Sequence, residues 1–166
     1  MKQLLIMRHA KSSWGDPAVE DFDRNLNERG KEDAPEMGKR ILKKGFKPDL
    51  IVSSPARRAL KTAKDVAREL GYDEKNIEQH FAIYEAAIED VIHVIRNLED
   101  QYERVIIVGH NPAFTGLVGY LGDALIENMP TAGAALLELN IKTWKQCAQQ
   151  CGKILWFDFP KNKVVE

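Results

Sequence analysis

The sequence predicts an α/β fold: a three-layer α/β/α sandwich with a mostly parallel central sheet and a β-rich C-terminal end. Short apolar segments alternate with segments of helical periodicity over most of the chain. Glycine, proline and capping residues mark the boundaries between these segments. The last part of the chain instead contains two strand-like segments with no clear long helix between them. Alternating strands and helices build a sheet covered by helices, and we expect the final strands to complete it.

The first predicted strand is an apolar segment that ends abruptly at an arginine and a histidine. Residues 4–7 are apolar, and Arg8-His9 follow directly. This length favours a strand over a helix. Ligands of open α/β sheets bind beyond the carboxyl ends of parallel strands, so Arg8 and His9 fall where a site is expected. Taken alone, the segment is more simply explained as a strand that ends in two exposed polar residues.

A loop rich in Ser, Gly, Asp and Pro separates this strand from the first predicted helix. Asn27 is suited to cap that helix, apolar residues then follow at helical spacing, and Gly45 is a natural end. Pro35 interrupts the pattern, so we expect it to kink or split the helix.

A second buried strand and a second helix follow. Residues 49–54 read as the strand, Ser54 is a good helix cap, and Pro55 suits the first helical position. Apolar residues repeat at helical spacing over 59–70, and Gly71 ends the run.

The second half of the chain continues this alternation and then changes character. We expect a short strand at 77–81, a helix with its apolar face over 88–98, a strand at 104–109 and a further helix with its apolar face over 114–121. Asn111-Pro112 would cap and open the last of these helices. Segments 134–141 and 154–159 look like strands that close the sheet as a hairpin-like pair.

Length and composition limit the number of domains and the kinds of partner that we expect. With 166 residues, the chain is most simply a single domain over 1–166. A net charge of −1 gives no electrostatic argument for binding nucleic acid or an anionic membrane. No segment approaches the roughly 20 apolar residues of a membrane span, and the N-terminal residues do not resemble a signal peptide. We therefore expect a cytoplasmic protein.

The cysteines, Cys147 and Cys151, lie close together in the sequence. Two thiols cannot complete a four-ligand zinc site, and the nearest histidine along the chain is His110. We expect two free thiols in a connecting segment, because a disulfide would be unusual in a reducing compartment.

Three predicted strand ends carry groups suited to binding a phosphoryl group: Arg8-His9, the segment 54–58 with two arginines, and the segment 109–112 with His110. Helix N-termini favour bound anions, and the planar fork of arginine can donate two parallel hydrogen bonds to phosphate oxygens. Gly109 would let the backbone approach a ligand closely. Each group alone has an ordinary structural explanation, but their coincidence at three strand ends favours a common site.

Three segments then resemble the motifs of the histidine phosphatase superfamily, the phosphoglycerate mutase-like proteins. Residues 7–10 resemble its Arg-His-Gly signature, with Ala10 in place of the usual glycine. Residues 54–63 resemble Ser-Pro-x-x-Arg-Ala followed by Thr-Ala, an alignment that selects Arg58 as the phosphate-binding arginine. Residues 108–112 resemble the third motif, which carries the second histidine.

A fourth segment, residues 23–30, resembles Asp-x-Pro-Leu-Thr-x-x-Gly, with Asn25 in place of proline. The motifs span almost the whole chain in the family's order. The chain is short and has no long insertions, and in this respect it is most similar to SixA-type phosphohistidine phosphatases.

The resemblance implies a role for each of the main site residues. His9 would be the nucleophile and form a transient phosphohistidine that water then hydrolyses. Arg8, Arg58 and His110 would hold the phosphoryl oxygens and offset the charge that develops on them. This scheme needs no metal and no cofactor.

The general acid is the open point. The resemblance implies a carboxylate after the third strand, for which Glu85 is the candidate; alternatively, Glu85 is a first-turn helix residue favoured by the helix dipole. Several loop residues are expected at the mouth of the pocket or in contact with substrate. The alternative is that they have no role in the site and only reflect the usual composition of loops. They are Lys11, Ser12, Ser13, Trp14, Asn111 and the turn 129–133.

The function implied is a metal-independent phosphatase with a phosphohistidine intermediate, whose preferred substrate would be a phosphorylated histidine in a protein. A small-molecule phosphomonoesterase of the same superfamily, acting on a small phosphorylated metabolite, is the nearest alternative. A catalytically idle phosphate-binding domain would have no need to keep Arg8, His9, Arg58 and His110 together. Zinc binding by the histidines lacks the required ligand spacing.

Overall fold

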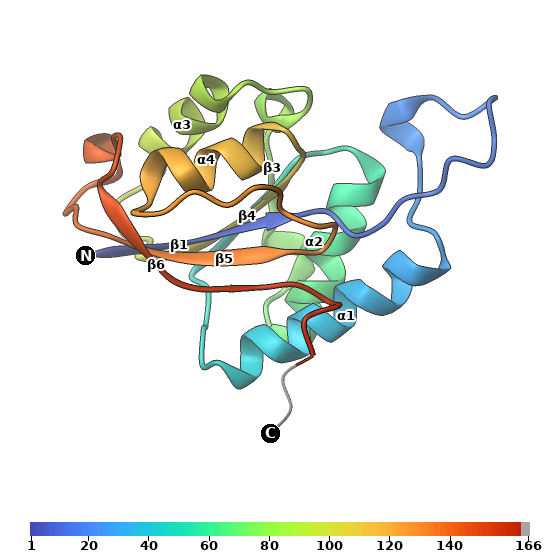
Figure 1. The fold of residues 1–166 in the computed structure, drawn as a ribbon, viewed down its shortest axis with the longest axis horizontal. Coiled ribbons are helices and arrows are strands. Elements are labelled where there is room, and N and C mark those ends of the chain that lie inside the picture. Colours follow the sequence, from blue (N-terminus) through green and yellow to red (C-terminus); the bar gives the residue numbers. More distant parts are fainter. Residues whose placement is uncertain (164–166) are drawn as a thin grey trace.

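The computed structural model describes residues 1–163 and contains a six-stranded sheet in the order β3-β2-β4-β1-β5-β6 (Figure 1). β1 pairs parallel to β4, β2 pairs parallel to both β4 and β3, and the final two strands are antiparallel. The strands are β1 Lys2–Arg8, β2 Leu50–Ser53, β3 Glu78–Gln79, β4 Arg104–Gly109, β5 Ala134–Leu139 and β6 Gly152–Asp158. The predicted fold class, including its β-rich end, is confirmed.

Helices cover both faces of this sheet (Figure 1). Within residues 1–163, the α-helices are α1 Glu28–Lys43, α2 Arg57–Leu70, α3 Ile88–Arg96 and α4 Ala113–Leu121. Two apolar clusters fill the space between the layers, one under α1 and α2 and the other under α3 and α4. Alternate residues of β1 enter opposite clusters: Leu5 belongs to the first and Leu4 to the second. This double burial explains why β1 is apolar without interruption.

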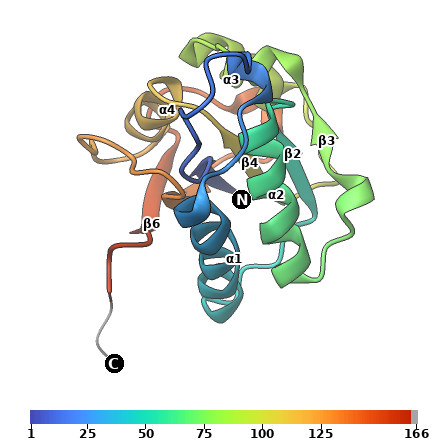
Figure 2. The ribbon, with the colours of Figure 1, turned by 90° about the vertical axis from the view of Figure 1, so that its right-hand side faces the viewer.

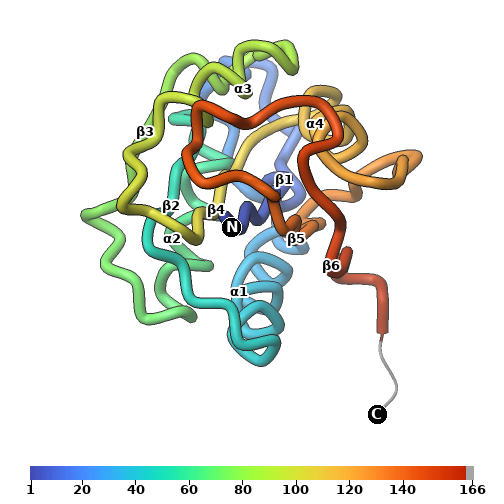
Figure 3. Tube along the Cα trace, turned by 90° about the vertical axis from the view of Figure 1, so that its left-hand side faces the viewer, coloured from blue at the N-terminus to red at the C-terminus, as the bar shows by residue number. Residues whose placement is uncertain are grey.

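The central position of β1 is visible from the end of the sheet opposite to the carboxyl ends of the parallel strands (Figure 3). There the N-terminus enters between β4 and β5, the two strands that flank β1 in the sheet. Among the described residues no helix combines the length and apolar character needed to cross a membrane.

The first helix differs from its prediction at Pro35. Asn27 caps α1 as expected, with its Oδ1 accepting the Gly30 N–H at 2.9 Å. α1 then runs unbroken through Pro35, so the predicted split is wrong. Burial of Met37 and Ile41 against the core stabilises the helix despite the backbone hydrogen bond that proline cannot make.

Two helices begin later than predicted. α2 has Ala56 as its N-cap, so Ser54 does not cap it and Pro55 precedes it. α4 has Pro112 as its N-cap, although Asn111 Oδ1 still accepts the Thr115 N–H at 3.1 Å. Both side chains also make a contact at the carboxyl end of the sheet: Ser54 Oγ with His110 Nε2, and Asn111 Nδ2 with the Met129 carbonyl.

β3 is also shorter than predicted, because Phe81 belongs to a 3₁₀ helix, Phe81–Ile83. The pairing of β5 with β6 is confirmed. Position 109 must be glycine for a reason that the sequence did not indicate. A Cβ there would lie 2.3 Å from Phe114 Cζ and 2.9 Å from Ile83 Cγ2. Core packing therefore requires the glycine, and close approach of a ligand to its backbone stays a prediction.

Candidate active site

The carboxyl ends of β1, β2 and β4 meet at one end of the sheet, which faces the viewer in Figure 2. The pairing register places Arg8 beside Gly109, and Ser53 beside Val108. The residues that follow these strands are therefore neighbours in space. His9, Arg58 and His110 are only 7%, 6% and 8% exposed. Buried polar groups are costly unless they are paired, so their clustering at this end indicates a functional site.

His9 is held in one tautomer with a free lone pair. Its Nδ1 lies 2.7 Å from the Ala10 carbonyl oxygen, which can only accept. The neutral ring therefore carries its proton on Nδ1 and leaves Nε2 unprotonated. Burial lowers the pKa of His9 to about 3, against the effect of the Ala10 hydrogen bond and aided by His110, Arg58 and Arg8. At neutral pH this imidazole therefore has a lone pair available for nucleophilic attack.

His110 stands beside His9, with their ring centroids 5.2 Å apart. Its Nε2 lies 2.8 Å from Ser54 Oγ, which also accepts the Ala56 N–H at 3.2 Å. Burial, and next to it Arg58, lowers the pKa of His110 to about 4. Because the Ser54 hydroxyl can donate to Nε2, the neutral ring can carry its proton on Nδ1 and present a donor.

The two arginines are anchored through their terminal nitrogens. Arg8 Nη1 donates to the Met129 carbonyl at 3.0 Å, while Arg58 donates from Nη1 to the Asp21 carbonyl at 2.7 Å. Arg58 Nη2 also donates to the Asp21 carboxylate at 3.1 Å. Burial, and next to it the charge of Arg58, lowers the pKa of Arg8.

Three buried nitrogens at this site have no hydrogen-bond partner within residues 1–163: Arg8 Nε, Arg58 Nε and His110 Nδ1. An unpaired buried donor costs roughly 1–3 kcal/mol, more for a charged group. Three such donors near His9 fit a ligand that supplies several anionic oxygens, as a phosphoryl group does.

Asp21 and Tyr84 belong to the site but were not identified from the sequence. Asp21 Oδ2 accepts from Arg58 Nη2 and from the Tyr84 hydroxyl, the latter at 2.6 Å. The Tyr84 ring meets the His110 ring edge-on, with centroids 5.6 Å apart. A single acid in a loop and a tyrosine before Glu85 carry no sequence signal of their own.

These contacts fix the protonation of both residues. The Tyr84 hydrogen bond, and with it Arg58, lowers the pKa of Asp21, so this carboxylate is ionised. Burial and the hydrogen bond to Asp21 raise the pKa of Tyr84 to about 12. Neither side chain is a ready proton donor at neutral pH.

Glu85 lies just before α3, in the turn that follows the 3₁₀ helix, and not in the first helical turn. The alternative explanation by the helix dipole is therefore wrong. Glu85 is exposed, has no hydrogen bond or ion pair within the described part of the chain, and has a left-handed φ of 55°. Such a conformation is strained for glutamate, and strain of this kind gathers at functional sites. Its role as general acid stays a prediction.

The predicted loop residues differ in how their side chains are used. Ser12 is buried and forms an isolated antiparallel β-bridge with Leu26. Ser13 is exposed, and its Oγ accepts the Gly15 N–H at 3.3 Å. Asn111 Nδ2 donates to the Met129 carbonyl at 3.1 Å, and this carbonyl also accepts from Arg8. Asn111 thus supports the turn that anchors Arg8. Contact of these three side chains with substrate stays a prediction.

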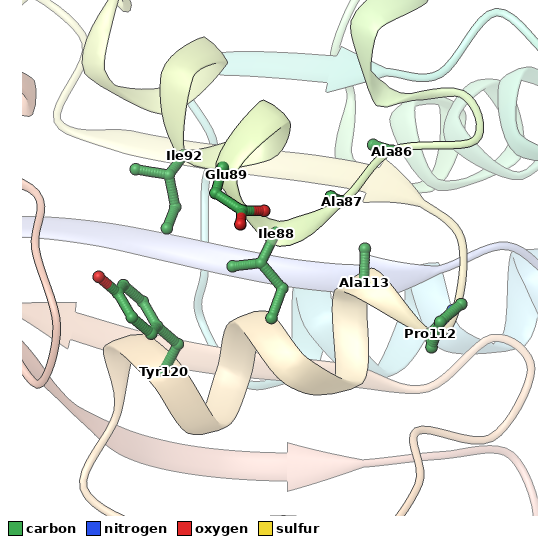
Figure 4. Close-up of a pocket in the computed structure, with 8 residues that line it drawn as sticks. All are labelled: Ala86, Ala87, Ile88, Glu89, Ile92, Pro112, Ala113 and Tyr120. Atoms are coloured by element: carbon green, nitrogen blue, oxygen red, sulfur yellow. The ribbon is translucent and has the colours of Figure 1, made fainter.

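An apolar groove of about 500 Å³ runs between α3 and α4, away from the site (Figure 4). It begins at Ala86 and Pro112, each next in sequence to a candidate site residue, and extends to Ile92 and Tyr120. None of the predicted site residues lines it.

Cys147 and Cys151 are free cysteines, as expected. Over residues 1–163, no group of three or more His, Cys, Asp and Glu side chains is arranged to hold a metal ion.

The depressed histidine pKa values predict that the protein loses stability in mild acid. The unfolded chain takes up these protons near pH 6.5, whereas folded His9 and His110 take them up only near pH 3 and 4. Stability is therefore complete above pH 6.5 and falls as the pH drops toward 4, by up to about 1.4 kcal/mol per pH unit for each histidine. Urea unfolding between pH 7.5 and 4.5 measures this slope.

The slope should become shallower in a variant with both His9→Asn and His110→Asn. His93→Asn, at an exposed position of α3, is the matched control and should keep the wild-type slope. An equal slope in the double variant and the wild type would contradict the assignment.

Comparison with known proteins gives a consistent set of similarities. Residues 4–90 match the model of the histidine phosphatase superfamily, branch 1. An uncharacterized chloroplastic protein of Arabidopsis thaliana is 29% identical over 163 residues, 93% of this chain and 74% of its own length.

Among solved structures, a putative phosphohistidine phosphatase SixA from Agrobacterium tumefaciens has a TM-score of 0.79 and 30% identity, over 96% of this chain and 98% of its own. A mycobacterial glucosyl-3-phosphoglycerate phosphatase shares the fold alone, with a TM-score of 0.65 and 16% identity over 96% and 98% of the two chains.

Proposed function

This chain belongs to the histidine phosphatase superfamily and is a phosphatase, and on that basis we propose that it removes the phosphoryl group from phosphohistidine in proteins. The observation that carries the proposal is that, among the described residues, no buried proton donor surrounds His9, while the candidate acid Glu85 is exposed. His110 and His9 are neutral, Asp21 is ionised, and the pKa of Tyr84 is about 12.

The reaction has two steps. His9 Nε2 attacks phosphorus in line, so that a P–N bond to His9 forms while the bond from phosphorus to the leaving group breaks. Water then attacks the phosphorylated His9, releases inorganic phosphate and restores the imidazole. Through both steps Arg8, Arg58 and His110 hold the phosphoryl oxygens, and their preorganised donors stabilise the charge of each transition state.

The leaving group determines whether this site can catalyse the reaction without a general acid. An alkoxide is a strong base and needs a proton as it departs, which makes general acid catalysis worth about 10²- to 10⁴-fold. The imidazole of phosphohistidine can already carry a proton on its other ring nitrogen, so it departs as a neutral molecule. A site with firm phosphoryl binding and no buried acid therefore suits a phosphoramidate better than an alkyl phosphate.

The variant Glu85→Gln tests this proposal. We expect its kcat/KM for a phosphohistidine peptide to stay within about 2-fold of the wild type, and any hydrolysis of phosphoserine to fall by roughly 10²-fold. Glu89→Gln, which removes an exposed carboxylate from α3, is the control for a change of net charge.

Two results would contradict the proposal. One is an equal loss on both substrates in Glu85→Gln. The other is a wild-type enzyme that hydrolyses phosphoserine faster than phosphohistidine.

A further inference from the structure

We propose that the hollow beside Tyr84 is the leaving-group subsite and that it receives the imidazole ring of the substrate phosphohistidine, an inference that rests on the proposed function. The hollow measures about 480 Å³, and its lining consists of Glu20, Asp21, Phe22, Phe81 and Tyr84. Its volume is ample for one five-membered ring together with part of the chain that carries it.

The hollow adjoins the phosphoryl-binding groups through Tyr84. The Tyr84 ring packs edge-on against His110, while its hydroxyl donates to the Asp21 carboxylate that also binds Arg58. Two of the proposed phosphoryl-binding side chains, Arg58 and His110, thus contact residues that line the hollow. In an in-line displacement the leaving group departs on the side away from the nucleophile, His9. Since His9 and His110 are buried, we assign that side to the open hollow.

Three aromatic rings form the walls. Phe22 stacks on Phe81 with centroids 5.8 Å apart, and Tyr84 meets both rings edge-on at 5.1 and 5.8 Å. Phe81 is 67% exposed, an unusual position for a large apolar side chain that serves packing alone. Exposed aromatic faces suit a flat ring, above all a cationic one.

The hollow and the phosphoryl pocket differ in charge. Arg8 and Arg58 supply the pocket with positive charge, whereas the described lining of the hollow contains no lysine or arginine. Of its two carboxylates, Asp21 is paired with Arg24 and Arg58, each at 3.1 Å, so Glu20, which has no ion pair among the described residues, supplies the unpaired negative charge. A phosphohistidine has this same division, because its phosphoryl group is anionic and its ring is cationic when protonated. The P–N bond breaks with its electron pair returning to the ring, which then leaves neutral and without any further proton.

The test compares two substrates that both need no general acid but differ in their leaving group. Free phosphohistidine leaves an imidazole ring, and acetyl phosphate leaves a small carboxylate. We expect Phe81→Leu to lower kcat/KM for phosphohistidine by about 3- to 10-fold and to change that for acetyl phosphate by less than about 2-fold. Leu125→Ala, at an exposed apolar position outside the hollow, should change neither value.

A second pair of variants tests the charge. Glu20→Gln should lower kcat/KM for phosphohistidine by about 2- to 5-fold at low salt, and less at high salt. Asp23→Asn removes the same charge from a nearby exposed position that does not line the hollow, and should leave the value unchanged.

The outcomes separate the two proposals. A wild-type enzyme that hydrolyses acetyl phosphate but not phosphohistidine would overturn the proposed function and the subsite with it. A wild-type enzyme that hydrolyses both, together with a Phe81→Leu variant that loses both equally or neither, would overturn the subsite alone.

Discussion

Replacing His9 with alanine should abolish turnover, with kcat falling by at least about 10⁴-fold. The neutral Nε2 of His9 is the nucleophile in the proposed mechanism, because Nδ1 is committed to the Ala10 carbonyl and burial holds the pKa near 3. Alanine leaves Arg8, Arg58 and His110 in place to bind phosphate, but no group that can form the covalent intermediate.

The measurement is hydrolysis of p-nitrophenyl phosphate and of a phosphohistidine peptide, both in the presence of EDTA. We expect the wild type to be active under these conditions, since no proposed step uses a metal. The exposed His93 of α3 gives the matched control, and His93→Ala should keep full activity. Activity of His9→Ala close to that of the wild type would remove the mechanism, and loss of wild-type activity in EDTA would show that a step requires a metal.

The parts of the fold that depend on local patterns were predictable from the sequence. β4 has the predicted bounds, because four consecutive apolar residues between Arg104 and Gly109 have few alternatives. Asn27 caps α1 and Gly71 ends α2 with a left-handed φ of 71°, as their residue types indicate.

Local patterns failed where tertiary contacts decide the outcome. Ser54 and Asn111 looked like ordinary helix caps, yet Ser54 Oγ is hydrogen-bonded to His110 and the Asn111 amide holds Met129. Gly109 looked like a place for a ligand, yet contact with the Phe114 ring already requires a glycine there. In each case the deciding neighbour is distant in sequence or lies on another element, so no local pattern reveals it.

The residues of the candidate site also divide into those that local patterns predict and those that only tertiary contacts reveal. Arg8, His9, Arg58 and His110 were predicted from strand ends and motifs, and the structure brings them together. Asp21 and Tyr84 were not, because their importance arises from contacts between distant residues: Tyr84 donates to Asp21, 63 positions away, and Asp21 also binds Arg58. The aromatic hollow depends on the same long-range contact.

Arg58 and Arg57 offer the second large prediction, since they are adjacent in sequence and differ in structure. Arg57 is exposed and has no hydrogen bond or ion pair within residues 1–163. Arg58 is 6% exposed, bound to Asp21, and has an unpartnered Nε beside the two histidines. We expect Arg58→Ala to lower kcat/KM by about 10²- to 10⁴-fold, because it removes preorganised charge and a fixed donor. Arg57→Ala should stay within about 2-fold of the wild type.

Arg58→Lys separates charge from geometry. Lysine keeps the positive charge but lacks the planar fork, so it cannot bind the Asp21 carbonyl and carboxylate while it presents a further N–H to the phosphoryl group. If the fixed fork matters, the lysine variant should remain at least about 10-fold below the wild type in kcat/KM. Its thermal unfolding midpoint, measured beside that of Arg58→Ala, reports whether the loop that carries Asp21 has been loosened. Full activity of Arg58→Lys would reduce the role of Arg58 to its charge. Equal losses in Arg57→Ala and Arg58→Ala would contradict the assignment of phosphoryl binding to Arg58 and not to Arg57.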